Sequence, residues 1–150
     1  MNAEAYCYVI WCDDVRQELG NKPSFMGVYT GGLVLPGLPA VLPRLTAWVV
    51  LSMPLGRPWA AVSISLARDD GEELIGIPTF SPPMPEDTHF SNGVPLTRVQ
   101  LMFALTMAPL QLPEACKYLS VTAKVGEVAL EAPKLHIQIA QPSPPGIDET

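Results

Sequence analysis

The chain has 150 residues, of which 48% are hydrophobic and 16% are charged, and its formal net charge is −6. This balance excludes a disordered chain and predicts a single folded domain over residues 1–141, followed by a flexible tail over residues 142–150. The nine Lys and Arg are scattered, so they form no basic stripe that could bind nucleic acid.

The sequence also bears on where the protein works. Apolar runs such as Leu45–Leu51 are too short to cross a bilayer, and Glu4 stands where a signal peptide would carry a basic residue. We therefore expect a cytoplasmic protein with no membrane partner. Cys7 and Cys12 should point to opposite faces of one strand, and no Cys or His spacing suggests a metal site, so we expect reduced, packed thiols and no cofactor.

The first segment of the chain combines an apolar strand with an acidic stretch. Ala5–Trp11 is apolar at both odd and even positions, which predicts a strand covered on both sides. We expect this strand to end near Cys12 and the next to begin near Ser24. Between them, Asp14–Gly20 fits one capped helical turn, so Asp13 and Asp14 are interpreted as part of a corner.

The rest of the chain alternates apolar and polar residues, which is typical of strands with one buried face. The apolar faces run over Leu45–Met53, Ala60–Leu66, Val99–Met107, Leu119–Val125 and Leu135–Ile139, and Asp69–Gly71 and Val125–Glu127 are predicted turns. With no amphipathic helix, seven or eight strands predict an all-β fold. We expect an antiparallel β-sandwich, either immunoglobulin-like or C2-like.

Proline occurs 17 times, against about 5% of residues in average proteins, and gathers in the predicted connections. These loops carry large apolar side chains that a connection does not need, which makes them candidates for binding a partner protein: Leu35, Leu38, Val41, Phe80, Met84 and Phe90. The alternative is that these side chains fold back and cap the open ends of the sandwich.

A second candidate surface comes from the strands themselves. Trp48 and Val50 occupy the expected outer face of their strand, and Tyr6 and Tyr8 belong to the two-sided first strand. These four residues are candidates for self-association through a sheet face. The alternative is that the proline loops cover this face.

Enzymatic function is a remote alternative. Asp13, Asp14, Glu18 and His89 could form a metal-dependent or hydrolytic site, and a second acidic group at Asp69–Glu73 could help to hold Ca²⁺. Adjacent carboxylates on a strand point apart, however, and neither a spaced D-x-D motif nor a Gly-x-Ser-x-Gly elbow is present. We therefore assign no catalytic, cofactor-binding or metal-binding residue.

The stretch Cys12–Gly32 resembles the opening signature of a family of uncharacterised small bacterial and bacteriophage proteins. The matching residues are Asp13, Asp14, Arg16, Glu18, Gly20, Lys22, Gly27, Val28 and Tyr29. Tyr118–Ala129 and Leu135–Ile139 resemble the end of the family pattern, whereas Pro78–Pro95 has no counterpart. The resemblance implies a phage or prophage origin and no known chemistry.

Together these observations predict a non-enzymatic protein–protein interaction module, for example an inhibitor or accessory factor that acts on a host protein. A self-associating structural subunit is the alternative, and a possible homo-oligomer is compatible with both.

Overall fold

The computed structural model describes residues 4–55 and 61–141. The predicted tail over 142–150 lies outside the described residues, and so does Ala60, the first residue of the predicted apolar face Ala60–Leu66. The described part is all-β, as expected, and contains no helix. Its strands are β1 (Tyr6–Glu18), β2 (Lys22–Val28), β3 (Leu33–Leu35), β4 (Ala40–Leu42), β5 (Leu45–Pro54), β6 (Val62–Arg68), β7 (Glu73–Phe80), β8 (Arg98–Met107), β9 (Leu110–Leu112), β10 (Tyr118–Val125), β11 (Val128–Glu131) and β12 (Leu135–Ile139).

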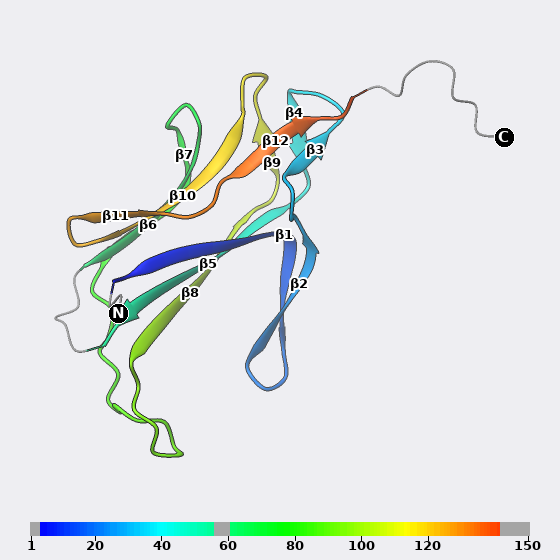
Figure 1. Ribbon diagram of the computed structural model, residues 1–150. Coiled ribbons are helices and arrows are strands. Elements are labelled where there is room, and N and C mark those ends of the chain that lie inside the picture. The colour runs from blue at the N-terminus through cyan, green and yellow to red at the C-terminus, as the bar shows by residue number, and fades with distance from the viewer. Residues whose placement is uncertain (1–3, 56–60, 142–150) are drawn as a thin grey trace.

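These strands form two larger sheets and one small one (Figure 1). The first sheet has the order β2-β1-β5-β8, and the second has the order β3-β12-β10-β6-β7, with β11 also paired to β10. Strands β4 and β9 make the small sheet. Every pairing is antiparallel except that of β12 with β3, which is parallel.

The sequence predicted five of the longer strands, missed the full extent of β1 and β7, and miscounted the short strands. Strands β5, β6, β8, β10 and β12 lie where the alternation placed them, and the turns at Asp69–Gly71 and Val125–Glu127 are present. The expected count of seven or eight is wrong, because the described residues form twelve strands. Four of these have only three or four residues, which is too short for alternation to be visible: β3, β4, β9 and β11.

The inward side chains of both larger sheets form one core cluster. Val49 and Leu51 of β5, Leu66 of β6, and Leu119 and Val121 of β10 are all fully buried there. Alternation explains this, because successive side chains of a strand point to opposite faces of its sheet. Within residues 4–55 and 61–141, no helix is long and apolar enough to span a membrane.

The predicted corner at Asp14–Gly20 is wrong. Strand β1 continues to Glu18, turns through Leu19–Asn21 and returns as β2, so the acidic stretch lies within a β-hairpin. Cys12 marks the change of partner, because it pairs with Thr46 of β5 on one side and Val28 of β2 on the other. Beyond Cys12, β1 and β2 form an arm (residues 13–28) that turns away from the first half of β1 (Figure 1).

Several polar residues of this arm lie beside a partner of complementary charge or hydrogen-bonding character. Glu18 lies opposite Lys22 in the hairpin register, and such opposite-charge pairs stabilise a sheet. Asp14 forms an ion pair with Arg44, with 3.2 Å between the carboxylate oxygen and Nε. Asp13 accepts a hydrogen bond from the Tyr29 hydroxyl. A two-stranded arm held by such pairs shows no hydrophobic alternation, which is why the sequence pattern suggested a corner.

Candidate interaction surface

The six predicted partner-binding residues do not form one surface. Leu35 lies in the core, and Phe80 packs edge-on against Phe103 with 6.0 Å between ring centroids, so both follow the fold-back alternative. Leu38 also packs against the core. The remaining three, Val41, Met84 and Phe90, are exposed.

The exposed loop residues also lie far from one another. Val41 belongs to β4, whereas Met84 and Phe90 belong to the connection between β7 and β8. Figure 1 shows β4 near the top of the molecule and that connection at the bottom. A single partner surface made of all the proline loops is therefore not present.

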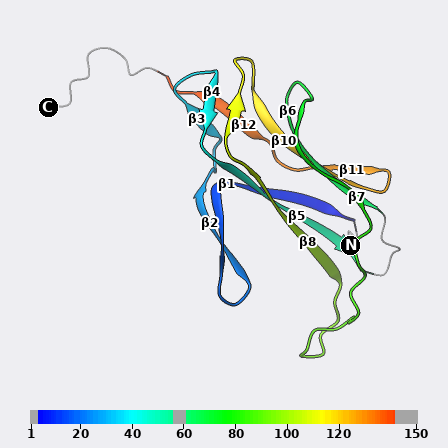
Figure 2. The same ribbon diagram turned by 180° about the vertical axis from the view of Figure 1, so that it is seen from behind.

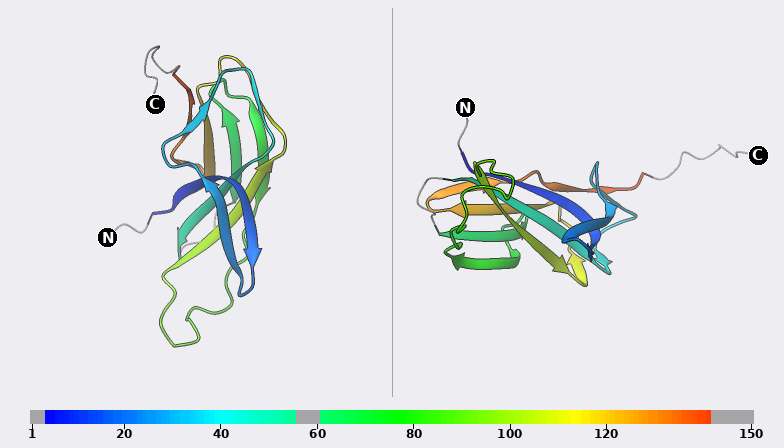
Figure 3. Two further views of the ribbon diagram at one scale, coloured as in Figure 1. Left: turned by 90° about the vertical axis from the view of Figure 1, so that its right-hand side faces the viewer. Right: turned by 90° about the horizontal axis from the view of Figure 1, so that it is seen from below.

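The four predicted self-association residues divide into two pairs. Trp48 and Val50 are buried, whereas Tyr6 and Tyr8 are 47% and 40% exposed. Trp48 is covered by the arm, where Phe25 of β2 packs edge-on against it with 5.5 Å between ring centroids. The left view of Figure 3 shows the arm passing in front of β5 and β8. The cover over Trp48 thus comes from the first hairpin and not from the proline loops.

Two rows of apolar residues cross the outer face of the first sheet, and we call them the apolar rows. By strand register they are Tyr8–Val50–Met102 and Ile10–Trp48–Ala104. The sequence prediction included four of the outer-face aromatic and aliphatic residues and missed Met102, which is 55% exposed. The signal was present, because Met102 is a large apolar residue on the side of its strand that also carries Gln100 and Thr106.

Strand β8 is the free edge of this sheet. In the described part of the chain its backbone bonds to β5 alone, in an unbroken register from Leu45↔Met107 to Pro54↔Arg98. Figures 1 and 2 show no strand along its other side. Such a row of unpaired N–H and C=O groups is a template for a further strand.

Edge strands normally carry features that block pairing, and the other long edges of this molecule do. The edge strand β2 contains Lys22, Pro23 and Gly27. The edge strand β7 contains Gly76 and Pro78, and its register with β6 is interrupted by irregularities. In contrast, β8 has 10 residues, RVQLMFALTM, with no proline, glycine, lysine or acidic residue.

The register shows which groups of β8 face outward. The carbonyl of Thr97 accepts a hydrogen bond from the N–H of Leu55, so odd-numbered residues direct their backbone groups toward β5. Consistently, Pro54, which has no N–H, lies opposite the even-numbered Arg98. The outward N–H and C=O groups therefore belong to Arg98, Gln100, Met102, Ala104 and Thr106.

Arg98, the one charged residue of β8, does not guard this edge. Its guanidinium turns back across its own sheet and donates to the Ser52 hydroxyl at 2.8 Å and to the Glu4 carbonyl at 2.6 Å. It also lies 4.8 Å from the centroid of the Tyr6 ring. The charge is thus held over β5 and β1, and the free side of β8 remains uncharged.

The acidic residues considered for catalysis have separate structural partners. Burial, together with the hydrogen bond to Asp13 and the charge of that carboxylate, raises the pKa of Tyr29 to about 12. Arg68 binds both Asp70, at 3.0 Å, and Glu72 in the β6–β7 turn. A hydrogen bond from the Glu72 N–H and the contact with Arg68 lower the pKa of Asp70.

No group of three His, Cys, Asp or Glu side chains comes together in residues 4–55 and 61–141 as a metal site would require. His89 lies in the β7–β8 connection beside Thr88, while Asp13 and Asp14 lie in β1. The four residues proposed for the enzymatic alternative are therefore not brought together.

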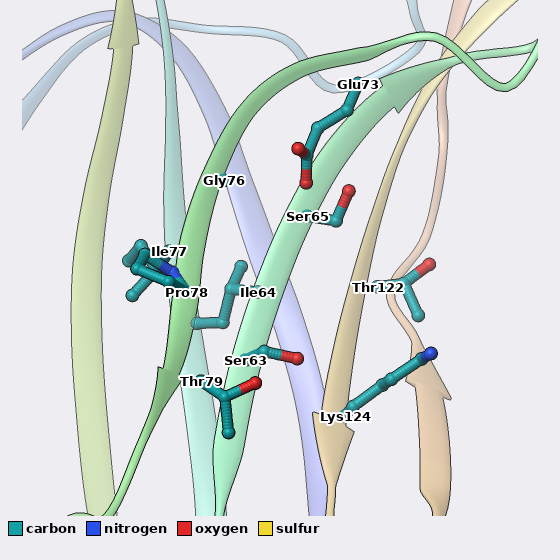
Figure 4. A pocket seen from close by; sticks show the side chains of 10 residues that line it. All are labelled: Ser63, Ile64, Ser65, Glu73, Gly76, Ile77, Pro78, Thr79, Thr122 and Lys124. Atoms are coloured by element: carbon teal, nitrogen blue, oxygen red, sulfur yellow. The ribbon is translucent and has the colours of Figure 1, made fainter.

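A polar groove of about 680 Å³ lies on the outside of the second sheet. Figure 4 shows hydroxyl groups of β6, β7 and β10 along it, with Glu73 at one end and Lys124 at the other. Its lining is Ser63, Ile64, Ser65, Glu73, Gly76, Ile77, Pro78, Thr79, Thr122 and Lys124. These hydroxyl, carboxylate and ammonium groups can form hydrogen bonds with a polar molecule in the groove.

The three cysteines are thiols, and Cys12 and Cys116 are buried. Burial raises the pKa of Cys7 and of Cys116 to about 11, and it also raises that of Cys12 together with the nearby Asp13 and Asp14. A raised pKa reduces the thiolate fraction and hence the reactivity of these side chains.

The candidate interaction surface is thus the outer side of the first sheet: the free edge of β8 and the apolar rows beside it. The likeness of Cys12–Gly32 to small bacterial and bacteriophage proteins stays a prediction, because no family model, no curated protein and no solved structure matches this chain.

Proposed function

We propose that this protein is a non-enzymatic interaction module that binds another polypeptide by adding its strand to the free edge of β8. The observation that carries the proposal is that β8 is a long edge strand without proline, glycine, lysine or acidic residues, whereas β2 and β7 are blocked by such residues. The apolar rows beside this edge offer side-chain contacts to the added strand.

Strand addition suits the chemistry of this surface. Outward N–H and C=O groups of β8 supply main-chain hydrogen bonds, and alternate side chains of the added strand lie beside Met102 and Ala104. The backbone bonds give affinity with little dependence on sequence, and the apolar side chains on the outer face select strands with a matching pattern.

The proposal also includes the fold class, the location, the origin and the non-enzymatic role that the sequence predicted. The core shared by two sheets supports a sandwich of immunoglobulin-like or C2-like class. The short apolar runs and Glu4 support a cytoplasmic location, and the resemblance of Cys12–Gly32 to bacterial and bacteriophage proteins supports a phage or prophage origin. The separate partners of Asp13, Asp14 and Asp70 support a role other than catalysis.

A second binding surface is favoured by the exposure of Met84 and Phe90. Both lie in the β7–β8 connection, which the left view of Figure 3 and Figure 1 show extending from the end of the first sheet. Replacing both by Ser would weaken binding of a protein partner that also contacts this connection, and would leave strand addition at β8 unchanged.

The experiment uses a fluorescent synthetic peptide that carries residues 97–108 as a strand of matching pattern. We expect the protein to bind it in the micromolar range, with slowed hydrogen exchange at the amides of Gln100, Met102 and Ala104. Ala104→Pro should abolish this binding, because proline removes an outward N–H. The fold should persist, since proline is tolerated where an edge N–H faces solvent.

Ala104→Ser is the matched control, because it keeps the N–H and should bind the peptide like the native protein. Equal binding by the Ala104→Pro and Ala104→Ser proteins, or no binding by the native protein at a concentration where it is monomeric, would contradict strand addition at β8.

A further inference from the structure

We infer that the strand added to β8 is the β8 of a second copy of this chain, paired antiparallel about a two-fold axis at Met102. This inference rests on the proposed function and names its partner. The result is a dimer in which two four-stranded sheets become one continuous sheet.

The register follows from the outward backbone groups. These belong to the even-numbered residues from Arg98 to Thr106, and the middle one is Met102. An antiparallel partner that uses all of them must place Met102 opposite Met102, Gln100 opposite Ala104, and Arg98 opposite Thr106. Any shift along the strand leaves outward groups without a partner.

One apolar row of the outer face is self-complementary in this register, and the other, Ile10–Trp48–Ala104, meets Gln100 of the second copy. The row Tyr8–Val50–Met102 continues directly into Met102, Val50 and Tyr8 of the second copy. The exposed part of Met102 is thereby covered by its own counterpart. Cross-strand pairs of this kind are the unit that stabilises a sheet.

The inner face gains in the same way. Val99, Leu101 and Phe103 are only half-buried, unlike the fully buried Val49 and Leu51 of the neighbouring β5. The two-fold register places Leu101 opposite Phe103, and Val99 opposite Leu105, of the second copy. Apolar surface that the single chain leaves open at its edge is then removed from water.

Charge does not oppose this pairing. β8 contains one charged residue, Arg98, whose guanidinium is held back over Ser52 and Tyr6. The antiparallel register places the two Arg98 residues at opposite ends of the new ladder, each facing Thr106. Because the two-fold pairing uses the β8 edge of each copy, neither copy keeps a free β8 edge, and association stops at the dimer.

The first test is the mass in solution, measured by light scattering after size exclusion at tens of micromolar. We expect twice the chain mass of 16.2 kDa. Met102→Lys should weaken the dimer by at least about tenfold, because it places two ammonium groups opposite each other at the axis. Val34→Lys is the matched control, since Val34 is 59% exposed on a strand of the other sheet, and it should stay dimeric.

The second test is cross-linking, which reads the register. In a hydrogen-bonded antiparallel pair the two Cα atoms lie about 5.5 Å apart, within the range for a disulfide. Met102→Cys should therefore form a covalent dimer on mild oxidation. Ala104→Cys should not, because its counterpart in the second copy is Gln100. Equal coupling by both variants would overturn the two-fold at Met102.

The outcomes separate this inference from the proposed function. A native protein that is monomeric at tens of micromolar, and that still binds the 97–108 peptide at β8, overturns the second copy as partner and leaves strand addition intact. A monomer that does not bind the peptide overturns both.

Discussion

Strands β5 and β6 are both central in their sheets, but they differ in what lies outside them. In β5 every residue from Leu45 to Met53 is buried, so both faces are covered. In β6 buried and half-buried residues alternate, and the outer side is the polar groove. The contrast teaches that a central position buries one face of a strand, and that a further layer is needed to bury the other.

That further layer is partly supplied by the chain and partly missing. The arm places Phe25 on Trp48, so one end of the outer face is covered. Toward β8, Met102 stays 55% exposed. The first sheet therefore has an outer face whose apolar rows are only half covered, which is the condition expected of a surface that meets another chain.

The largest expected effect comes from removing the covered aromatic side chain. Trp48→Ala should lower the free energy of unfolding by about 3 kcal/mol or more, because it leaves a cavity between β5 and the arm. Ser65→Ala, the matched change on the outer face of β6, should alter it by less than about 0.5 kcal/mol. Urea unfolding at one fixed protein concentration measures both. Equal effects would erase the difference between the two strands.

A smaller effect is expected where the arm joins the sheet. Gly27 has a φ of +66°, and a Cβ added there would collide with the Asp13 carboxylate, which holds the Tyr29 hydroxyl. Gly27→Ala should therefore lower the free energy of unfolding by about 1–2 kcal/mol and loosen the arm over Trp48. Gly31→Ala is the control, because an added Cβ meets nothing there.

Tryptophan fluorescence responds to the arm, because Trp48, one of three tryptophans, packs against Phe25 of the arm. A red shift in Gly27→Ala, absent in Gly31→Ala, is the result that links the glycine to the cover over Trp48. A stable Gly27→Ala protein with native fluorescence would show that the arm does not depend on this backbone conformation.

A separate effect, which needs no substitution, is a loss of stability at alkaline pH. The folded-state pKa values of Cys7 and Cys116 are raised to about 11, above the value of about 8.5 in an unfolded chain. The folded state thus keeps these protons longer. The stabilising contribution is complete below about pH 8.5, and the free energy of unfolding falls as pH rises toward 11.

Chemical denaturation between pH 8 and pH 10.5 measures this slope, and replacing both residues by Ala should flatten it. A related test concerns the outer face of the first sheet. Cys12 is buried there, on the part of β1 next to the arm. Its alkylation in the native protein should be slow. Rapid alkylation of Cys12 would indicate that the arm does not protect this part of the sheet.

The sequence predicted the parts of the fold that depend on one strand at a time. Alternation identified the inward residues of β5, β6, β8, β10 and β12, because it reflects one buried face and nothing more. It also identified the two-sided apolar character of the first strand and the outer positions of Trp48 and Val50. What covers those positions depends on a distant hairpin, and no local pattern contains that information.

The candidate site was predictable only in part for the same reason. Tyr6 and Tyr8 are exposed on the expected face, but the free edge of β8 follows from the pairing of β5 with β8, and two other strands separate them in the chain. For the loop residues, the sequence predicted exposed binding side chains that the fold in part buries. Leu35 and Phe80 were read as available because they lie near prolines, whereas tertiary packing buries the first and half-buries the second.

The order of the first sheet also sets a condition on biosynthesis. The apolar strand β5 leaves the ribosome well before β8, its partner on one side, which is complete only at Met107. At ordinary translation speeds this interval is on the order of several seconds. During that time β5, which is buried on both faces in the folded protein, lacks one of its two partner strands. Efficient production should therefore depend on chaperones that bind this segment until β8 has emerged.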